Sequence, residues 1–66
     1  MTNTEAKEQM RAGLKVSHST FTDKEWATIK GIDTLLSNDG YVMSEEDFWK
    51  LRTSEVFKTG WFLFNT

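Results

Sequence analysis

Ser37-Asn38-Asp39-Gly40-Tyr41-Val42-Met43 carries the strongest structural signal in the chain. Asp39 and Gly40 both tolerate the positive φ that a tight hairpin turn requires, and a strand-forming run follows them. We therefore expect a hairpin at residues 38–40, which joins a strand over residues 32–37 to a second strand that begins at Tyr41.

The segment before this hairpin is open to two interpretations. Apolar residues between Trp26 and Leu36 fall close to helical spacing, which permits a helix in this region. Gly31 would lie in the middle of that helix at a cost of about 1 kcal/mol, and the neighbouring β-branched residues favour strands. The sequence predicts strands over residues 25–30 and 32–37, with the helix as the alternative.

The start of the chain predicts a helix followed by a strand. Thr2 and Glu5 have the spacing of a capping box, which indicates a helix over about residues 3–12. Gly13 suits the C-terminal cap of that helix. From Leu14 onward apolar and polar residues alternate, and this alternation predicts a half-buried strand.

The end of the chain predicts a short helix and a C-terminal strand. Ser44 with Asp47 three residues later is an N-cap signal, which opens a helix over residues 45–52. The run from Trp61 to Phe64 is apolar on both alternating faces, which is typical of a central strand or of a strand whose second face meets another subunit. The expected interface residues are Trp61, Phe62 and Phe64.

The length indicates one small domain over residues 1–66, and the predicted helices and strands make its class α+β. A chain of this size buries only about 60% of its surface. Cysteine is absent and histidine occurs once, which excludes disulfides and zinc fingers. Oligomerisation and dense aromatic packing are the supports that remain.

Charge and hydropathy argue against two classes of partner, duplex nucleic acid and membranes. The net charge of −2 and the pI of about 5.2 provide no broad positive field for duplex nucleic acid. No apolar run approaches the length of a membrane span, and the polar start of the chain lacks the apolar core of a signal peptide. We expect a cytoplasmic protein that does not bind membranes.

Catalysis is not expected. His18 is the only residue whose ordinary pKa lies near neutrality, and its neighbours Ser17 and Ser19 would point to the opposite face of a strand. A hydrogen-bonded polar residue on the sheet is therefore the leading interpretation of His18. The acidic cluster over residues 45–47 matches the positive end of a helix dipole, so neither a metal site nor a cofactor is expected.

The nine aromatic residues (three Trp, one Tyr and five Phe) exceed what a small core needs. Flat rings near cationic side chains form sites in which a base stacks on the ring and Lys or Arg meets the phosphate. Arg52 follows Trp49 closely and is the best such pair. The predicted ligand-binding residues are Lys15, His18, Trp26, Trp49 and Arg52.

The order of residues after the first predicted helix is Gly13, Lys15, Val16, His18 and Phe21. This order resembles the opening of the small phage-encoded Thoeris anti-defence proteins of the cyclic-nucleotide sponge type, in which a glycine, a lysine, a valine, a basic residue or histidine, and an aromatic follow a helix. Related uncharacterised phage proteins look similar at Asp39-Gly40, Phe48-Trp49 with Arg52, and Gly60-Trp61.

The resemblance implies an α+β fold, a homo-oligomer and a signalling nucleotide that is held between subunits without being cleaved. It makes a phage counter-defence protein that sequesters a cyclic nucleotide in the host cytoplasm our first hypothesis. The alternative is a small inhibitor that covers its aromatic surface with a host enzyme such as a nuclease, a CRISPR effector or a polymerase.

Overall fold

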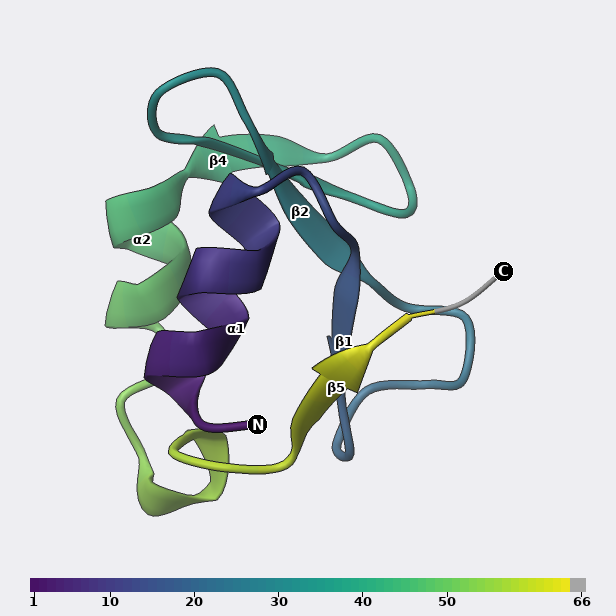
Figure 1. Cartoon of the computed structure of the whole chain (residues 1–66), viewed down its shortest axis with the longest axis vertical. Helices are drawn as coiled ribbons and strands as arrows, with labels where there is room; N and C mark the ends of the chain where they lie inside the picture. The colour runs from purple at the N-terminus through teal and green to yellow at the C-terminus, as the bar shows by residue number, and fades with distance from the viewer. Residues whose placement is uncertain (65–66) are drawn as a thin grey trace.

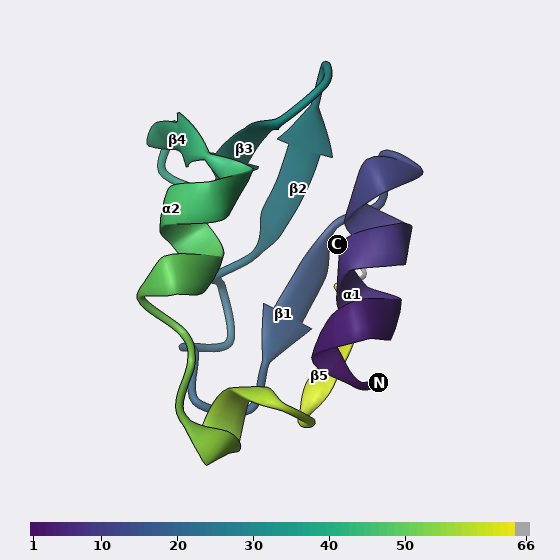
Figure 2. The same ribbon diagram turned by 90° about the vertical axis from the view of Figure 1, so that its left-hand side faces the viewer.

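The computed structural model describes residues 1–64, in which two helices lie against one face of a five-stranded antiparallel sheet (Figure 1, Figure 2). The elements in chain order are α1 (Asn3–Arg11), β1 (Val16–His18), β2 (Ala27–Lys30), β3 (Thr34–Ser37), β4 (Val42–Ser44), α2 (Glu45–Lys50), the 3-10 helix η1 (Glu55–Phe57) and β5 (Trp61–Leu63). The strand order is β4-β3-β2-β1-β5. The predicted α+β class is confirmed.

The predicted hairpin at residues 38–40 and the two predicted strands before it are present, so the helical alternative for the segment between Trp26 and Leu36 is wrong. Gly31 has φ 76° in the turn between β2 and β3, and Gly40 has φ 82° in the turn between β3 and β4. Asp39 does not adopt a positive φ. Its carboxylate instead accepts hydrogen bonds from the Ser37 hydroxyl and from the Tyr41 N–H, which closes the turn from within.

The first helix follows its capping signals. The Thr2 hydroxyl accepts from the Glu5 N–H at 3.2 Å, and the Glu5 carboxylate accepts from the Thr2 N–H at 2.8 Å. Gly13 has φ 88° just beyond the C-terminus of α1. These are the two ends that the sequence predicts, because capping contacts join residues only a few positions apart.

The second helix begins where predicted but ends two residues earlier than predicted. The Ser44 hydroxyl accepts from the Asp47 N–H at 3.1 Å and starts α2. At the other end the Arg52 N–H donates to the Trp49 carbonyl oxygen, three residues back, so the last turn tightens and the α-helix stops at Lys50. Leu51 is 75% exposed and adds no packing that would extend the helix.

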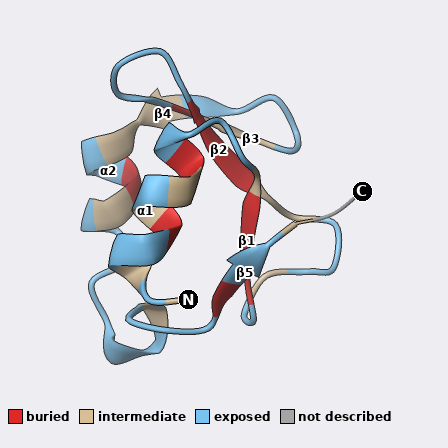
Figure 3. Cartoon of the chain, viewed as in Figure 1, coloured by how far each residue is buried: buried red, intermediate tan, exposed pale blue. Residues whose placement is uncertain are grey.

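The core lies between the sheet and the two helices (Figure 3). Ala6 and Met10, four residues apart on α1, face the sheet, and Phe48 does the same from α2. Each of these side chains is 3% exposed or less. The sheet contributes Val16, Ala27, Ile29, Leu35 and Trp61.

The first strand is buried on both faces, so the prediction of a half-buried strand is wrong. Ser17 is 1% exposed, although its side chain lies on the opposite face of the sheet from the core residue Val16. β1 has β2 on one side and β5 on the other, and Ser17 lies opposite Phe62 in the register. Larger side chains on the flanking strands can therefore cover the small serine.

The C-terminal strand is an edge strand, not a central one. Trp61 is 2% exposed and belongs to the core, so its assignment to an intersubunit interface is wrong. The Met1 backbone nitrogen donates to the Trp61 carbonyl oxygen at 2.7 Å, and Met1 thereby covers part of the open edge. Phe62 is 48% exposed and Phe64 is partly buried, and their contact with a second chain stays a prediction.

Candidate functional site

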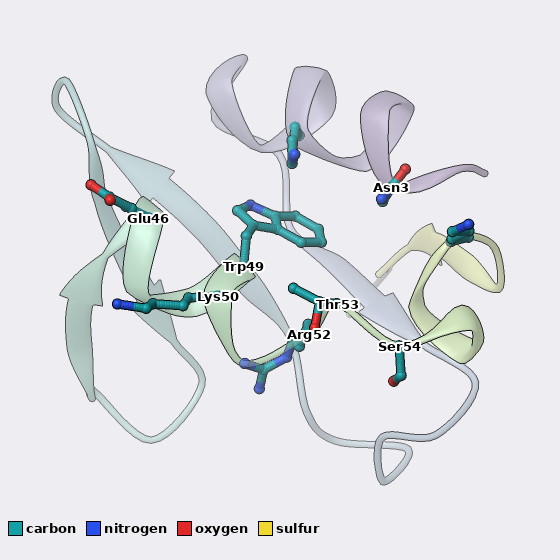
Figure 4. A pocket seen from close by; sticks show the side chains of 9 residues that line it. Asn3, Glu46, Trp49, Lys50, Arg52, Thr53 and Ser54 are labelled. Atoms are coloured by element: carbon teal, nitrogen blue, oxygen red, sulfur yellow. The ribbon is translucent and has the colours of Figure 1, made fainter.

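A pocket of about 540 Å³ lies between α1, α2 and the segment that leads into η1 (Figure 4). Its rim is rich in cations, which are Lys7, Lys50, Arg52 and Lys58, and it contains one carboxylate, that of Glu46. The remaining lining residues are Asn3, Trp49, Thr53 and Ser54. Lys58 is paired with the Glu55 carboxylate at 2.9 Å, so the excess of positive charge comes from Lys7, Lys50 and Arg52, and it favours an anionic ligand.

Trp49 is the largest side chain in this pocket, and its ring is held in place by aromatic neighbours. It packs edge-to-face on Phe48 with centroids 5.0 Å apart, and its centroid lies 5.1 Å from that of Trp61. Figure 4 shows the indole rising from α2 toward α1. Because the ring is braced by the core, it forms a rigid platform on the pocket side.

Trp49 has two further features, an unpaired donor and a cation beside its ring. Its indole Nε1 is buried and has no hydrogen-bond partner, which is uncommon for a buried donor. The Lys7 ammonium lies 4.9 Å from the ring centroid, so a cation occupies the space over the ring. The ring and the nearby ammonium together suit a flat anionic molecule, while the buried Nε1 has almost no exposed surface for an acceptor to reach.

Arg52 lines the same pocket but is anchored in the core. Its guanidinium carbon lies 3.9 Å from the centroid of the Phe48 ring, and Nη1 donates to the Phe48 carbonyl oxygen at 3.1 Å. Its Nε is buried without a partner. Burial lowers the pKa of Arg52 from its ordinary value, and the nearby charge of Glu25 opposes that shift. The contacts with Phe48 therefore hold the Arg52 guanidinium in one orientation.

Lys15 and Trp26 pair with each other away from this pocket. The Lys15 ammonium lies 4.3 Å from the centroid of the Trp26 ring. Lys15 precedes Val16 of β1 and Trp26 precedes Ala27 of β2, so alternation places both side chains on the face of the sheet opposite the helices. The structure brings Trp49 and Arg52 together but does not bring Lys15 or Trp26 to them.

His18 lies in the core and is not placed to meet a ligand. It is 1% exposed, and its Nε2 lies 2.9 Å from the Val56 carbonyl oxygen and 2.7 Å from that of Thr59. Carbonyl oxygens only accept, so Nε2 carries the hydrogen and Nδ1 accepts from the Thr20 N–H. The ring ties the end of β1 to the η1 region, which agrees with the hydrogen-bonded interpretation of this residue.

Sequence reasoning did not single out the lysines of the pocket. Asn3 and Lys7 are four residues apart on α1 and share a helix face, which periodicity alone would have shown. Lys50 and Lys58 come from α2 and from the turn after η1. No local signal indicates that these segments meet, because the contact depends on how the two helices pack on the sheet.

Two further classes of site are not found in the part of the chain that the structure describes. Across residues 1–64 no three His, Asp or Glu side chains gather as a metal site would require. None of the helices in this range is long and apolar enough to cross a membrane.

Comparisons with known proteins found no matching family model, no matching curated protein and no matching solved structure.

Proposed function

We propose that this protein binds a nucleotide in the pocket between α1 and α2 and holds it without chemical change, so that the free nucleotide is withdrawn from solution. The observation that carries the proposal is the Trp49 ring, which combines a braced aromatic platform with a cationic rim. A nucleotide supplies the matching groups, which are a flat base and phosphate charge.

The base would stack on Trp49. Stacking on an aromatic side chain contributes about 1–3 kcal/mol per base. The Lys7 ammonium now lies over this ring, and its flexible side chain can move to a phosphate when a base takes its place. Arg52, which is fixed on Phe48, would meet a phosphate with little loss of side-chain entropy.

Binding without turnover is supported by the chemistry of the lining. The described residues around the pocket include one carboxylate, Glu46, and no histidine. The hydroxyls of Thr53 and Ser54 have no base beside them in that lining that would activate a nucleophile. The resemblance to phage nucleotide sponges gives the proposed sequestration its biological setting, a counter-defence role in the cytoplasm of an infected host.

Calorimetric titration with a panel of cyclic mononucleotides and cyclic dinucleotides tests this proposal. Trp49→Ala is expected to weaken binding at least about fivefold, the lower limit of the stacking contribution. Tyr41→Ala is the matched control, because Tyr41 is an exposed aromatic that does not line the pocket. The nucleotide recovered after incubation is expected to have its original mass.

A second variant guards against misfolding of Trp49→Ala. Lys50 is exposed and Lys7 is partly exposed, so the double variant Lys7→Gln, Lys50→Gln should fold and should bind more weakly. Failure of the whole panel to bind would contradict the proposal. Recovery of an altered nucleotide would contradict the absence of turnover.

A further inference from the structure

The face of the sheet away from the helices carries a second group of aromatic and cationic side chains. Both helices lie on one side of the sheet, and among the described residues the other side carries no helix, although the loop that joins β1 to β2 projects there (Figure 1). Alternation from the core residues places small polar and aliphatic residues on this side (Ser17, Thr28, Leu36 and Val42). The same side carries three aromatic residues, Trp26, Phe62 and Phe64, and two lysines, Lys15 and Lys30. We call these five residues the open face.

Two of the aromatic residues lie in one row across three neighbouring strands. Phe62 of β5 lies opposite Ser17 of β1, and the pairing of Val16 with Ala27 puts Ser17 opposite Trp26. The two aromatic residues are therefore separated by two strand spacings, on the order of 10 Å. Ser17, between them, is 1% exposed. Phe62 and Trp26 are therefore the two aromatic side chains of this row. Backbone hydrogen bonds between the strands hold the sheet rigid, so the positions of both side chains on the sheet are fixed.

The open face has an excess of positive charge although the chain has a net charge of −2. Lys15 lies over the Trp26 ring, and its carbonyl oxygen accepts from the Phe64 N–H at 2.9 Å, so it sits among the aromatics. Lys30 is exposed at the far end of β2. Alternation places no carboxylate on this side among the described strand residues.

We propose that the open face binds single-stranded nucleic acid, with bases stacked on Phe62 and Trp26 and phosphates at Lys15 and Lys30. Aromatic side chains interleaved with cations are the usual means of binding single strands, because every base has a face that stacks. Lysine is depleted in protein–protein interfaces, and a second copy of this face would add two more lysines without, among the described strand residues, a carboxylate to pair with them. The charge therefore favours a polyanion with flat groups over a protein partner.

Fluorescence anisotropy with a labelled twelve-residue oligodeoxythymidine at low salt tests the proposal. Phe62→Ala is expected to weaken binding at least about fivefold. Leu51→Ala is the matched control, because Leu51 is an exposed apolar residue of the helix layer and should leave the affinity unchanged. Circular dichroism checks that both variants fold.

The salt dependence provides a second readout that does not depend on an aromatic substitution. Each phosphate neutralised on a single strand contributes a slope of about −0.7 in the logarithm of affinity against the logarithm of salt. Two lysines predict a slope of about −1.4 for the wild type and of about −0.7 for Lys30→Gln.

Four outcomes would overturn the proposal. These are no binding of the oligonucleotide at low salt, unchanged binding by Phe62→Ala, equal binding of a duplex of the same length, and a dimer that Phe62→Ala dissociates while no oligonucleotide binds. The last result would assign the face to contact between copies of the chain. Trp49→Ala should bind the oligonucleotide as the wild type does, so this site and the nucleotide pocket can fail independently.

Discussion

Arg52 stacks on the ring of Phe48, four residues before it, and bonds to the carbonyl oxygen of that same residue. The cation thus satisfies one of the carbonyl groups that the end of α2 leaves unpaired, and its charge matches the negative end of the helix dipole. Arg52 therefore has a structural role as well as a place in the pocket lining.

Replacing Arg52 by Lys is expected to lower the free energy of unfolding by about 1 kcal/mol. Lysine keeps the charge but loses the planar group that stacks on Phe48 and donates to its carbonyl. Urea denaturation measures the change. Lys50→Ala, at an exposed position of the same helix, should change the stability by less than about 0.5 kcal/mol. Equal stability of Arg52→Lys and the wild type would show that the stack contributes nothing.

His18→Leu is expected to destabilise the protein by about 2–4 kcal/mol. The leucine is similar in bulk, but it leaves the carbonyl oxygens of Val56 and Thr59 without their buried donor. Thermal or urea denaturation gives the value, with the exposed Ser19→Ala as the control. A variant as stable as the wild type would mean that water replaces the imidazole at little cost.

Gly60→Ala is expected to be far more harmful than Gly40→Ala. Both glycines have positive φ, 90° and 82°, so alanine is strained at either position by about 1–2 kcal/mol. A Cβ at Gly60 would also lie 2.9 Å from the Ser19 hydroxyl and 3.0 Å from His18 Nε2, whereas nothing lies within 4 Å at Gly40. Both variants share the backbone strain, so the difference between their melting temperatures measures the clash at position 60. Equal losses would show that His18 and Ser19 move aside freely.

Asp39 is expected to make the stability fall in acid. Hydrogen bonds from the Ser37 hydroxyl and the Tyr41 N–H lower the pKa of its carboxyl below the ordinary 3.8. A depressed pKa in the folded state contributes stability that is present above the unfolded value and is lost as the pH falls through the folded pKa. Asp39→Asn does not titrate, so its melting temperature should decline less than that of the wild type below pH 3.8. Parallel curves for the two proteins would contradict this assignment.

Turn and cap residues were sufficient to predict most of the elements. The Thr2 and Glu5 capping box, the Ser44 cap and the Gly40 turn are contacts between residues at most three positions apart, so any compact fold of this chain can form them. The candidate site was predicted in part. Trp49 and Arg52 share a pocket, while Lys15 and Trp26 lie on the other face of the sheet and His18 is in the core.

The sequence alone determined the positions of the turns and of the helix ends. These positions depend on hydrogen bonds between residues a few positions apart and on the positive φ that glycine adopts. Only the tertiary structure decided that β5 lies at the edge beside β1 while Trp61 is buried, and that Lys7 of α1 meets Trp49 of α2. The physical reason is that the burial of a side chain depends on which face of the sheet packs against which face of each helix. The strand order and the packing of both helices on one side of the sheet fix those contacts between residues far apart in the chain.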